Sequence, residues 1–287
     1  MSVNRQSARE DTVKANIHVH GFLANTGEYQ KSPHFRPENR AKIRNVLVRL
    51  TENLQGRAAT KAIDFGCGTG FMIDLMHDLF SEVHGVDITT DMMKHVDLSR
   101  GNVQLHECLA ESTPFPDDHF EFATAYSFMD HLFNYQDFLV EAFRVIKPGG
   151  MFYSDLNPNR AFINAVDQAS RQNDPVLACT PIVEREIQGA LHNGAYYQEN
   201  FGVDARLLEQ AEPIKSIDKG FDVAEVLATA RGIGFTQCSV EYEWFLGQAK
   251  VMHEQSMDLA DSIDKYLHSV LPVSSHLFKY LRFVFLK

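Results

Sequence analysis

The chain has 287 residues, of which 44% are hydrophobic and 23% charged, and its formal net charge is −11. This composition is that of a globular protein with a sizeable core. The acidic balance, without a cluster of Lys and Arg, argues against a nucleic-acid partner, which a basic face normally binds. No apolar run reaches the roughly 18 residues that a membrane-spanning helix needs, and the polar start "MSVNRQSARED" lacks the apolar centre of a secretion signal. We expect a cytoplasmic protein that acts on a small molecule, with no nucleic-acid or membrane partner.

The cysteines and histidines follow no metal-binding or disulfide pattern. The cysteines are far apart without a CxxC pair, and none of the 13 histidines is paired as HExxH. His18 and His20 stand two apart in "NIHVHG", so on a strand they would point to the same side. We favour contacts from a lid over a metal pair, and we predict no metal site. The cysteines are Cys67, Cys108, Cys179 and Cys238.

The first half of the chain alternates helices and strands. Apolar residues at helical spacing predict a helix over 38–54, ended by Gly56. Gly70 opens a second helix, and a third over 135–146 is halted by "KPGG". Strands are predicted at 60–65 ("TKAIDF"), 82–88 ("EVHGVDI"), 102–109 ("NVQLHECL"), 120–128 ("FEFATAYSF") and 151–156 ("MFYSDL").

The pattern loosens beyond Pro158. We predict a helix near Phe162 and Val166, then a hairpin over 182–201 with Asn193-Gly194 as its turn. A helix follows within "FDVAEVLATARGIGF", with Asp222 and Glu225 spaced as a capping box and Gly232 as the C-terminal stop. The remaining elements are a strand over 236–244, an amphipathic helix over 248–271 and a strand over 278–286.

Strands and helices that alternate at this spacing indicate an α/β fold, a doubly wound and mostly parallel sheet with helices on both faces. We expect one domain over 1–287, with an N-terminal lid over 1–40. The cofactor-binding half would span 61–157. The late insertions, at 158–220 and 248–275, would cap the substrate.

Three glycines stand in "DFGCGTG", where the first predicted strand ends and a helix begins. A dinucleotide-binding GxGxxG would need glycine where Phe71 stands, and the GK[ST] of a phosphate-binding loop is absent. "DFGCGTG" instead resembles the first motif of the class I S-adenosylmethionine-dependent methyltransferases. "GVDIT", "AESTPFPDDHFEFATAYSF" and "AFRVIKPGGMFYSD" resemble the motifs that follow, in the same order, between Lys61 and Asp155.

The resemblance implies a Rossmann-like methyltransferase fold with a seven-stranded sheet. It also implies S-adenosylmethionine as cofactor, S-adenosylhomocysteine as product, and methyl transfer to an O, N or C nucleophile of a small molecule. Asp87 would accept the ribose hydroxyls, while Ile88 and Met92 would pack on the adenine. The expected cofactor-binding residues are Asp64, Gly66, Cys67, Gly68, Gly70, Asp87, Ile88, Met92, Ala110, Glu111, Tyr126 and Ser127.

The third motif departs from the family. Many members have an acidic residue just before the Ala-Glu pair, where this chain has Leu109. A leucine accepts no hydrogen bond, so we expect the backbone of Ala110 to serve the adenine ring and Glu111 to take over the amino contact.

A general base is needed only when the acceptor atom carries a proton at neutral pH. Our candidates at the carboxyl edge of the sheet are His131, Asp155 and Tyr126. Ser127 and Phe128 are expected beside the cofactor's sulfur. Further residues could reach the acceptor from the lid or the predicted hairpin; these are His18, His20, Tyr29, His34, Tyr196, Tyr197 and Phe201.

Three other interpretations of the sequence remain open. One is a protein that binds the same cofactor but carries out cyclase or decarboxylase chemistry. The second is an NAD-type oxidoreductase, which Phe71 disfavours, and the third is a non-catalytic partner subunit. An arsenic-methylating enzyme would need grouped cysteines, which are absent. A homodimer is compatible with the sequence.

Overall fold

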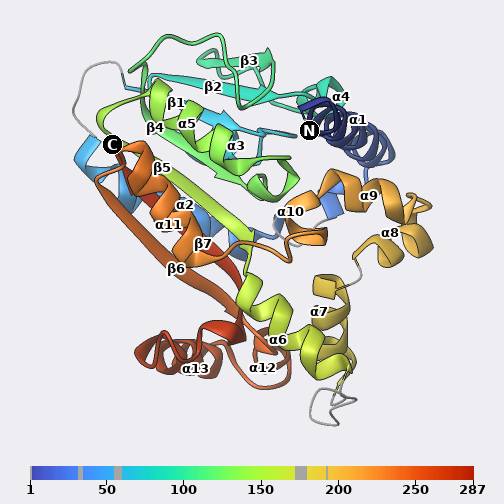
Figure 1. Cartoon of the computed structure of the whole chain (residues 1–287). Coiled ribbons are helices and arrows are strands. Elements are labelled where there is room, and N and C mark those ends of the chain that lie inside the picture. Colours follow the sequence, from blue (N-terminus) through green and yellow to red (C-terminus); the bar gives the residue numbers. More distant parts are fainter. Residues whose placement is uncertain (1, 32–34, 55–59, 172–179, 192) are drawn as a thin grey trace.

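The computed structural model describes residues 2–31, 35–54, 60–171, 180–191 and 193–287. Within these ranges the chain forms a sheet of seven strands in the order β3-β2-β1-β4-β5-β7-β6 (Figure 1). β7 is antiparallel to β5 and β6, and the other neighbours are parallel. The predicted doubly wound, mostly parallel sheet is confirmed. The strands are β1 Lys61–Phe65, β2 Glu82–Asp87, β3 Val103–Glu107, β4 Phe120–Tyr126, β5 Ile146–Pro158, β6 Gln237–Phe245 and β7 Phe278–Leu286.

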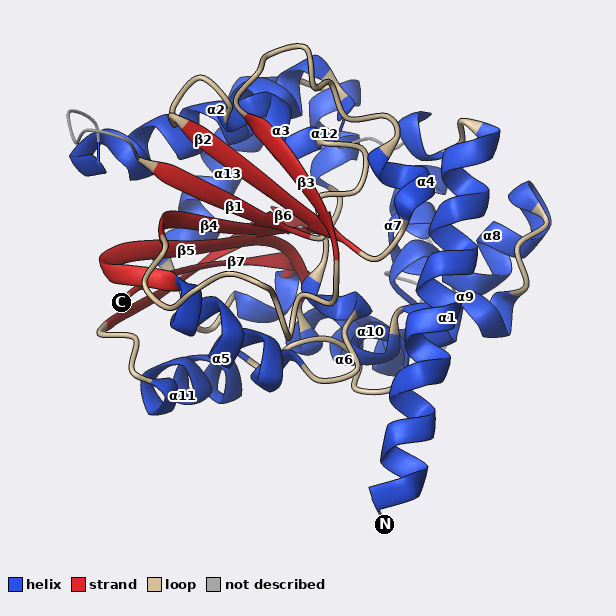
Figure 2. Ribbon diagram, turned by 90° about the horizontal axis from the view of Figure 1, so that it is seen from above, coloured by secondary structure: helices blue, strands red, loops and turns tan. Residues whose placement is uncertain are grey.

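Helices cover both faces of the sheet. Figure 2 shows α5 and α11 below the strands and α2 and α3 above them. The helices of the first half are α1 Ser2–Thr26, α2 Pro37–Thr51, α3 Phe71–Met76, α4 Thr90–Met93 and α5 Tyr135–Val145. Those of the second half are α6 Arg160–Arg171, α7 Pro181–Leu191, α8 Asn193–Phe201, α9 Ala205–Ala211, α10 Pro213–Ser216, α11 Val223–Ile233, α12 Gln248–Glu254 and α13 Met257–Ser269.

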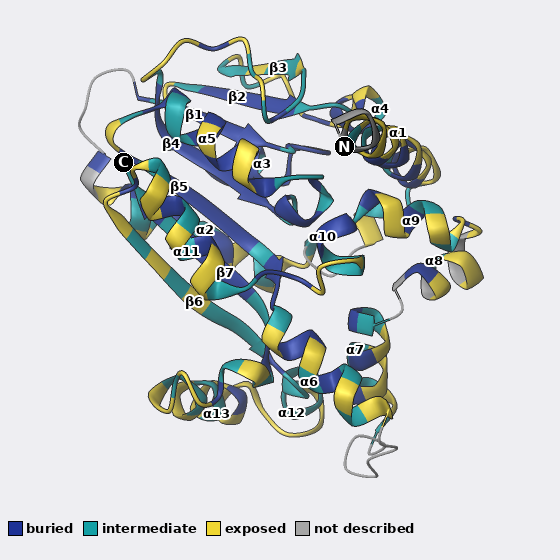
Figure 3. Cartoon of the chain, in the orientation of Figure 1, coloured by how far each residue is buried: buried dark blue, intermediate teal, exposed yellow. Residues whose placement is uncertain are grey.

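β4 is the centre of the core, and all of its residues are buried (Figure 3). Because side chains alternate along a strand, its apolar residues serve two separate clusters. Phe122 and Tyr126 pack with α2 and α3, whereas Ala123 and Ala125 pack with α5 and α11. The sheet is thus buried on both faces at the strand beside which the glycine loop lies.

The predicted hairpin over 182–201 is wrong, because this segment forms α7 and α8. Val183, Ile187 and Ala190 recur at helical spacing and bury against α6. Gly194, taken from sequence as a turn residue, lies in the first turn of α8, where an added Cβ would lie 2.9 Å from the backbone oxygen of Ala205. Its glycine therefore allows a close approach between helices rather than a hairpin turn.

Other boundaries also differ from the sequence predictions. The single helix expected over 248–271 is divided into α12 and α13, because Ser256 starts a new helix by accepting the N–H of Leu259. The C-terminal stop of α11 is Gly234, with φ 131°, and not Gly232. The expected capping contact of α11 is present, since Asp222 accepts the N–H of Glu225. Gly56 lies outside the described residues.

The N-terminal segment forms one long helix, which the sequence analysis did not predict. α1 lies beside the carboxyl ends of the strands and packs on α9 (Figure 1). Ala15, Val19 and Leu23 form its buried stripe at steps of four. On this helix His18 and His20 diverge, so the same-side arrangement expected for a strand is not formed.

A buried ion pair joins β5 to β7. Asp155 accepts two bonds of 2.8 Å from the guanidinium of Arg282, and the side chains are 2% and 3% exposed. Asp155 also accepts the hydroxyl proton of Tyr153 at 2.6 Å. Arg282 reaches Glu241 and Glu243 on β6, so this network connects three strands.

We predict that Asp155→Ala lowers the free energy of unfolding by about 3 kcal/mol, because it removes the most deeply buried of the three carboxylates that pair with the buried Arg282. Urea unfolding followed by circular dichroism measures the loss. Asp78→Ala is the control, since it breaks an exposed pair with Arg44 and should cost under about 1 kcal/mol. Equal losses in the two variants would contradict this role of Asp155.

Asp64 is a second buried carboxylate, at the end of β1. It is 2% exposed, and Thr124 of β4 donates a 2.7 Å hydrogen bond to it. Burial raises the pKa of Asp64 to about 7, and the nearby charge of Asp87 acts in the same direction. In the folded protein this carboxyl is therefore protonated more readily than in an unfolded chain.

The raised pKa of Asp64 implies a stability term that is present below the unfolded pKa of about 4 and lost as the pH rises through about 7. An amide in place of this carboxyl cannot ionise, but its oxygen can still accept the bond from Thr124. We therefore expect Asp64→Asn to gain about 2–4 kcal/mol relative to the wild type between about pH 4 and pH 8. Urea unfolding across this range measures the difference. Asp218→Asn, at an exposed site, should follow the wild-type curve, and an Asp64→Asn curve parallel to the wild type would refute the prediction.

Candidate functional site

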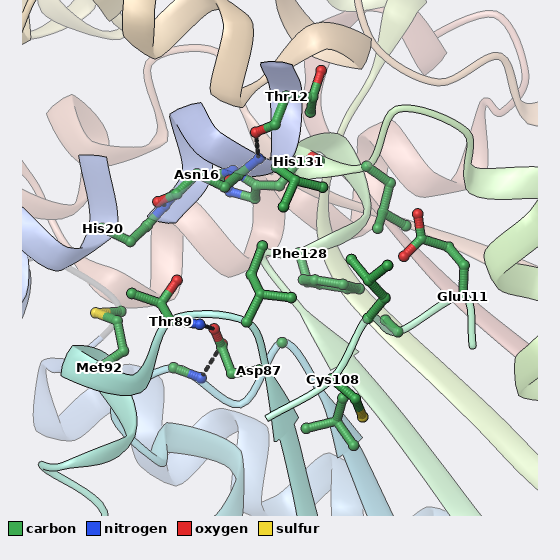
Figure 4. Close-up of a pocket in the computed structure, with 18 of the residues that line it drawn as sticks. Thr12, Asn16, His20, Asp87, Thr89, Met92, Cys108, Glu111, Phe128 and His131 are labelled. Carbon is green, nitrogen blue, oxygen red and sulfur yellow. Dashed lines mark hydrogen bonds between the residues drawn. The ribbon is translucent and has the colours of Figure 1, made fainter. Parts of the chain in front are cut away.

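A pocket opens at the carboxyl ends of β1, β2 and β4, where the strand order reverses. It encloses about 730 Å³, including its open mouth. Figure 4 shows α1 side chains on one side and Asp87, Thr89 and Met92 on the other. The lining residues are Arg9, Thr12, Val13, Asn16, His20, Tyr29, Gly66, Gly68, Val86, Asp87, Ile88, Thr89, Met92, Cys108, Leu109, Ala110, Glu111, Ser127, Phe128, His131, Leu132 and Phe133.

The glycine loop between β1 and α3 adopts a backbone that side chains disfavour. Gly66, Gly68 and Gly70 have φ values of 67°, 50° and 88°. The N–H groups of Gly66 and Cys67 bind the carbonyl of Val86, at 2.8 and 3.0 Å. The loop is therefore fixed against the end of β2.

At Gly66, space as well as backbone conformation requires glycine. A Cβ on Gly66 would lie 2.0 Å from the ring of Phe128. On Gly68 it would lie 3.2 Å from Met92 and 3.6 Å from the hydroxyl of Tyr29. The sequence analysis explained Gly66 only by contact with the cofactor. The ring of Phe128 also excludes a side chain at this position.

Asp87 links the glycine loop to α4. One carboxylate oxygen accepts the N–H of Gly68 at 2.9 Å, and the other accepts the N–H of Thr89 at 2.7 Å (Figure 4). Burial raises the pKa of Asp87, and these two N–H groups oppose that effect. Each oxygen keeps a second lone pair, so Asp87 can still accept hydrogen bonds from a diol in the pocket.

The opposite wall comes from the loop after β3, where Leu109, Ala110 and Glu111 line the pocket. The carboxylate of Glu111 lies 3.5 Å from the guanidinium of Arg9 on α1. The carboxylate of Glu111, which was predicted to contact the adenine, therefore also pairs with Arg9, a residue that the sequence analysis did not consider.

α1 forms the roof of the pocket. Arg9, Thr12, Val13, Asn16 and His20 face it, at steps of three and four along the helix. The sequence signal for this helix was the apolar repeat of Ala15, Val19 and Leu23, which packs on α9 and which the strand interpretation of "NIHVHG" obscured.

Polar contacts fix α1 at its middle and near its C-terminus. The side-chain amide of Asn16 donates to the carbonyls of His131 and Ala211, at 3.1 and 3.0 Å. Asn25 donates to Asp91 of α4 at 3.1 Å. Together with Arg9, these contacts bind the roof to both walls.

Two of the three catalytic candidates lie away from the pocket lining. The hydroxyl of Tyr126 accepts a 3.0 Å bond from Asn39, and burial raises its pKa. Asp155 is held by Arg282. His131 does line the pocket, in the short 3-10 turn Met129–His131.

Some of the other candidate residues line the pocket, and others do not. His20 and Tyr29 reach the pocket from the lid, while His18 is exposed. Tyr197 packs on the α1–α9 cluster. His34 and the side chains of Tyr196 and Phe201 are outside the described part. The predicted cofactor residues in the lining are Gly66, Gly68, Asp87, Ile88, Met92, Ala110, Glu111 and Ser127, whereas Asp64, Cys67, Gly70 and Tyr126 are not part of it.

Metal and membrane features are both missing from the described ranges. No group of three or more His, Cys, Asp and Glu side chains there is arranged to hold a metal ion. None of the helices in those ranges has the length and apolar character needed to cross a bilayer.

The residues of the pocket fit an adenosyl sulfonium. Asp87 offers free lone pairs to a ribose, and the apolar Ile88 and Met92 stand beside it for a base. The carboxyl ends of β1 and β4 present Gly68 and Ser127 at the switch point, where ligands of such sheets bind.

Comparison with known proteins agrees with this geometry. The family described as "Methyltransferase domain" matches residues 63–154. A probable S-adenosylmethionine-dependent methyltransferase of Mycolicibacterium smegmatis is 29% identical over 207 residues, covering 72% of this chain and 68% of that protein. A ubiquinone/menaquinone biosynthesis C-methyltransferase of Pseudomonas fluorescens is 28% identical over 213 residues, covering 67% and 79%.

Solved structures share the fold. A chain in the complex between the Haloferax volcanii Trm112 methyltransferase activator and a methyltransferase superposes with a TM-score of 0.52, at 15% identity, over 93% of this chain and 96% of that chain. A SAM-dependent methyltransferase of Archaeoglobus fulgidus gives a TM-score of 0.50, at 15% identity, over 86% and 94%. The motifs, the sheet and these relatives agree, and the chain belongs to the class I S-adenosylmethionine-dependent methyltransferases.

Proposed function

We propose that this enzyme methylates a small molecule held between the glycine loop and α1. The observation that carries the proposal is that one cavity contains both a cofactor-type wall, with Gly68 and Asp87, and a polar roof, with Asn16, His20 and His131. The cofactor and its acceptor would share that cavity.

In this proposal the cofactor lies along the carboxyl ends of the strands. Asp87 accepts the ribose hydroxyls, and Ile88 and Met92 flank the adenine. Ser127 and the glycine loop stand beside the amino-acid end. S-adenosylmethionine supplies an electrophilic methyl group on a positively charged sulfur.

The contribution of the chain is mainly alignment and exclusion of water. Fixed contacts of α1 with both walls support this view, because they hold the acceptor side of the pocket in a set position. Phe128, Leu132 and Phe133 add apolar surface that an organic acceptor can contact.

Three observations support an acceptor of small size. The pocket is roofed by a helix, so it is not open to a large ligand from that side. The net charge of −11 gives no general attraction for nucleic acid. Two relatives at low identity are named for quinone biosynthesis: one is a ubiquinone/menaquinone C-methyltransferase and the other a ubiquinone O-methyltransferase.

We expect label from methyl-labelled S-adenosylmethionine to appear in the low-molecular-weight fraction when the enzyme is incubated with a metabolite extract. Chromatography separates this fraction from protein and nucleic acid, and mass spectrometry identifies the product. Gly68→Val, whose side chain would collide with Met92 and Tyr29, serves as the inactive control. Label found only in macromolecules, or cofactor consumed without label transfer, would overturn the proposal.

Asp87→Asn should weaken binding of S-adenosylhomocysteine by about tenfold to a hundredfold, because an amide replaces one of the two acceptor oxygens by a donor. Isothermal titration calorimetry measures the change. Asp97→Asn, at an exposed site ten residues further along the chain, is the matched control and should bind normally. Unchanged affinity in Asp87→Asn would remove the ribose contact from the proposal.

A further inference from the structure

Two imidazoles from distant parts of the chain meet in the roof of the pocket. His20 of α1 and His131 of the Met129–His131 turn have ring centroids 4.9 Å apart, edge to face at 79°. Figure 4 shows both on the α1 side, across the cavity from Asp87. They therefore stand where an acceptor would lie over the cofactor.

Hydrogen bonds fix the orientation of both rings. Nδ1 of His20 lies 3.0 Å from the carbonyl of Asn16, and Nδ1 of His131 lies 3.2 Å from that of Ala211. A carbonyl only accepts, so each Nδ1 carries the hydrogen and a neutral ring has its lone pair on Nε2. Burial, with the adjacent His131, lowers the pKa of His20 to about 4, so His20 is neutral at pH 7.

Both Nε2 atoms are available to a ligand. Neither has a hydrogen-bond partner among the described residues. Neither nitrogen belongs to the described atoms that are both buried and without a partner, so each has some exposed surface. Both side chains line the pocket. The two nitrogens are thus open to the cavity and able to accept hydrogen bonds from its contents.

A buried carboxylate stands behind His131. Asp130 is 6% exposed, and its Oδ1 is a buried atom without a hydrogen-bond partner, 3.9 Å from Nε2 of His131. Such an atom is costly unless a hydrogen-bond donor or a cation lies beside it. Burial raises the pKa of Asp130, and the neighbouring His131 acts in the opposite direction.

The other charges near the pair come from three elements. Glu212 and Lys215, at the start of α10, pair with each other at 3.1 Å. Asp87 faces the pair from β2. With Asp130 and the neutral His20, these surroundings carry more negative than positive charge.

No free carboxylate in the described lining is left for a cationic acceptor. Glu111 is paired with Arg9, and in the proposed function the ribose hydroxyls take the lone pairs that Gly68 and Thr89 leave on Asp87. Val13, Leu132 and Phe133 add apolar surface to the lining. This favours a neutral acceptor that donates a hydrogen bond.

We propose that the acceptor is a small molecule with an acidic hydroxyl, a phenol or an enol, that His131 removes its proton, and that His20 positions it. The inference rests on the proposed function. The hydroxyl proton passes to Nε2 of His131, and a lone pair of the oxygen forms the new bond to the methyl carbon. The bond from that carbon to sulfur breaks, its electrons neutralise the sulfur, and the proton later leaves for solvent.

The test uses the whole protein saturated with S-adenosylhomocysteine and the chromophore 4-nitrophenol as probe, because its absorption distinguishes phenol from phenolate. At a pH where the free probe is mostly protonated, the wild type should bind it with a raised phenolate fraction. His131→Gln can keep the bond to Ala211, so it should fold and bind S-adenosylhomocysteine, yet lose the phenolate signal at least fivefold. His20→Gln should weaken probe binding about fivefold and keep the signal of the bound fraction.

Three controls separate the causes. 4-Nitroanisole has the same ring without the hydroxyl and should bind all variants alike. His18→Gln, on the exposed side of α1, should behave as the wild type. Asp130→Asn should move the ionisation of the bound probe to higher pH without changing affinity for 4-nitroanisole, which a purely structural role would not produce.

The outcomes distinguish the two proposals. Failure of the wild type to bind S-adenosylhomocysteine would overturn the proposed function itself. With that binding intact, the hydroxyl inference is overturned if 4-nitrophenol does not bind, if His131→Gln keeps the phenolate signal, or if 4-nitrobenzylammonium binds more tightly than 4-nitrophenol.

Discussion

The site depends on the carboxylate of Asp87, which binds the backbone of two successive segments at once. By accepting the N–H groups of Gly68 and Thr89, it holds the glycine loop and the start of α4 at a fixed separation. Charge-assisted bonds of this kind are stronger than neutral ones. Because the loop has left-handed backbone that only glycine adopts readily, this anchoring determines both the shape of the cofactor wall and the position of Met92.

Three aspartates stand at or near the carboxyl ends of parallel strands, and their partners give them different roles. Asp64 binds a hydroxyl of Thr124 in a buried setting. Asp87 binds backbone and keeps one side open to the pocket. Asp155 faces Arg282 and completes an ion pair across the antiparallel end of the sheet. A shared position in the sequence pattern therefore does not imply shared chemistry, because the neighbouring strand supplies the partner.

α1 turns an open crevice into a cavity with two functional sides. Its contacts with Glu111, Asp91 and the carbonyls of His131 and Ala211 connect the roof to each wall. The same helix brings His20 against His131. A water-poor space with fixed polar groups above the strand ends is what alkyl transfer from a sulfonium requires, since alignment provides most of the catalysis.

The sequence by itself determined the sheet and the cofactor wall. Alternating apolar runs, the glycines at 66, 68 and 70 and the carboxylate at 87 follow local rules of strand, turn and helix, and these rules act over a few neighbouring residues. Only the tertiary structure decided the α1 side of the pocket. The contact of His20 with His131, the pairing of Arg9 with Glu111 and the pairing of Asp155 with Arg282 join residues about a hundred or more positions apart, and no local pattern encodes such distances.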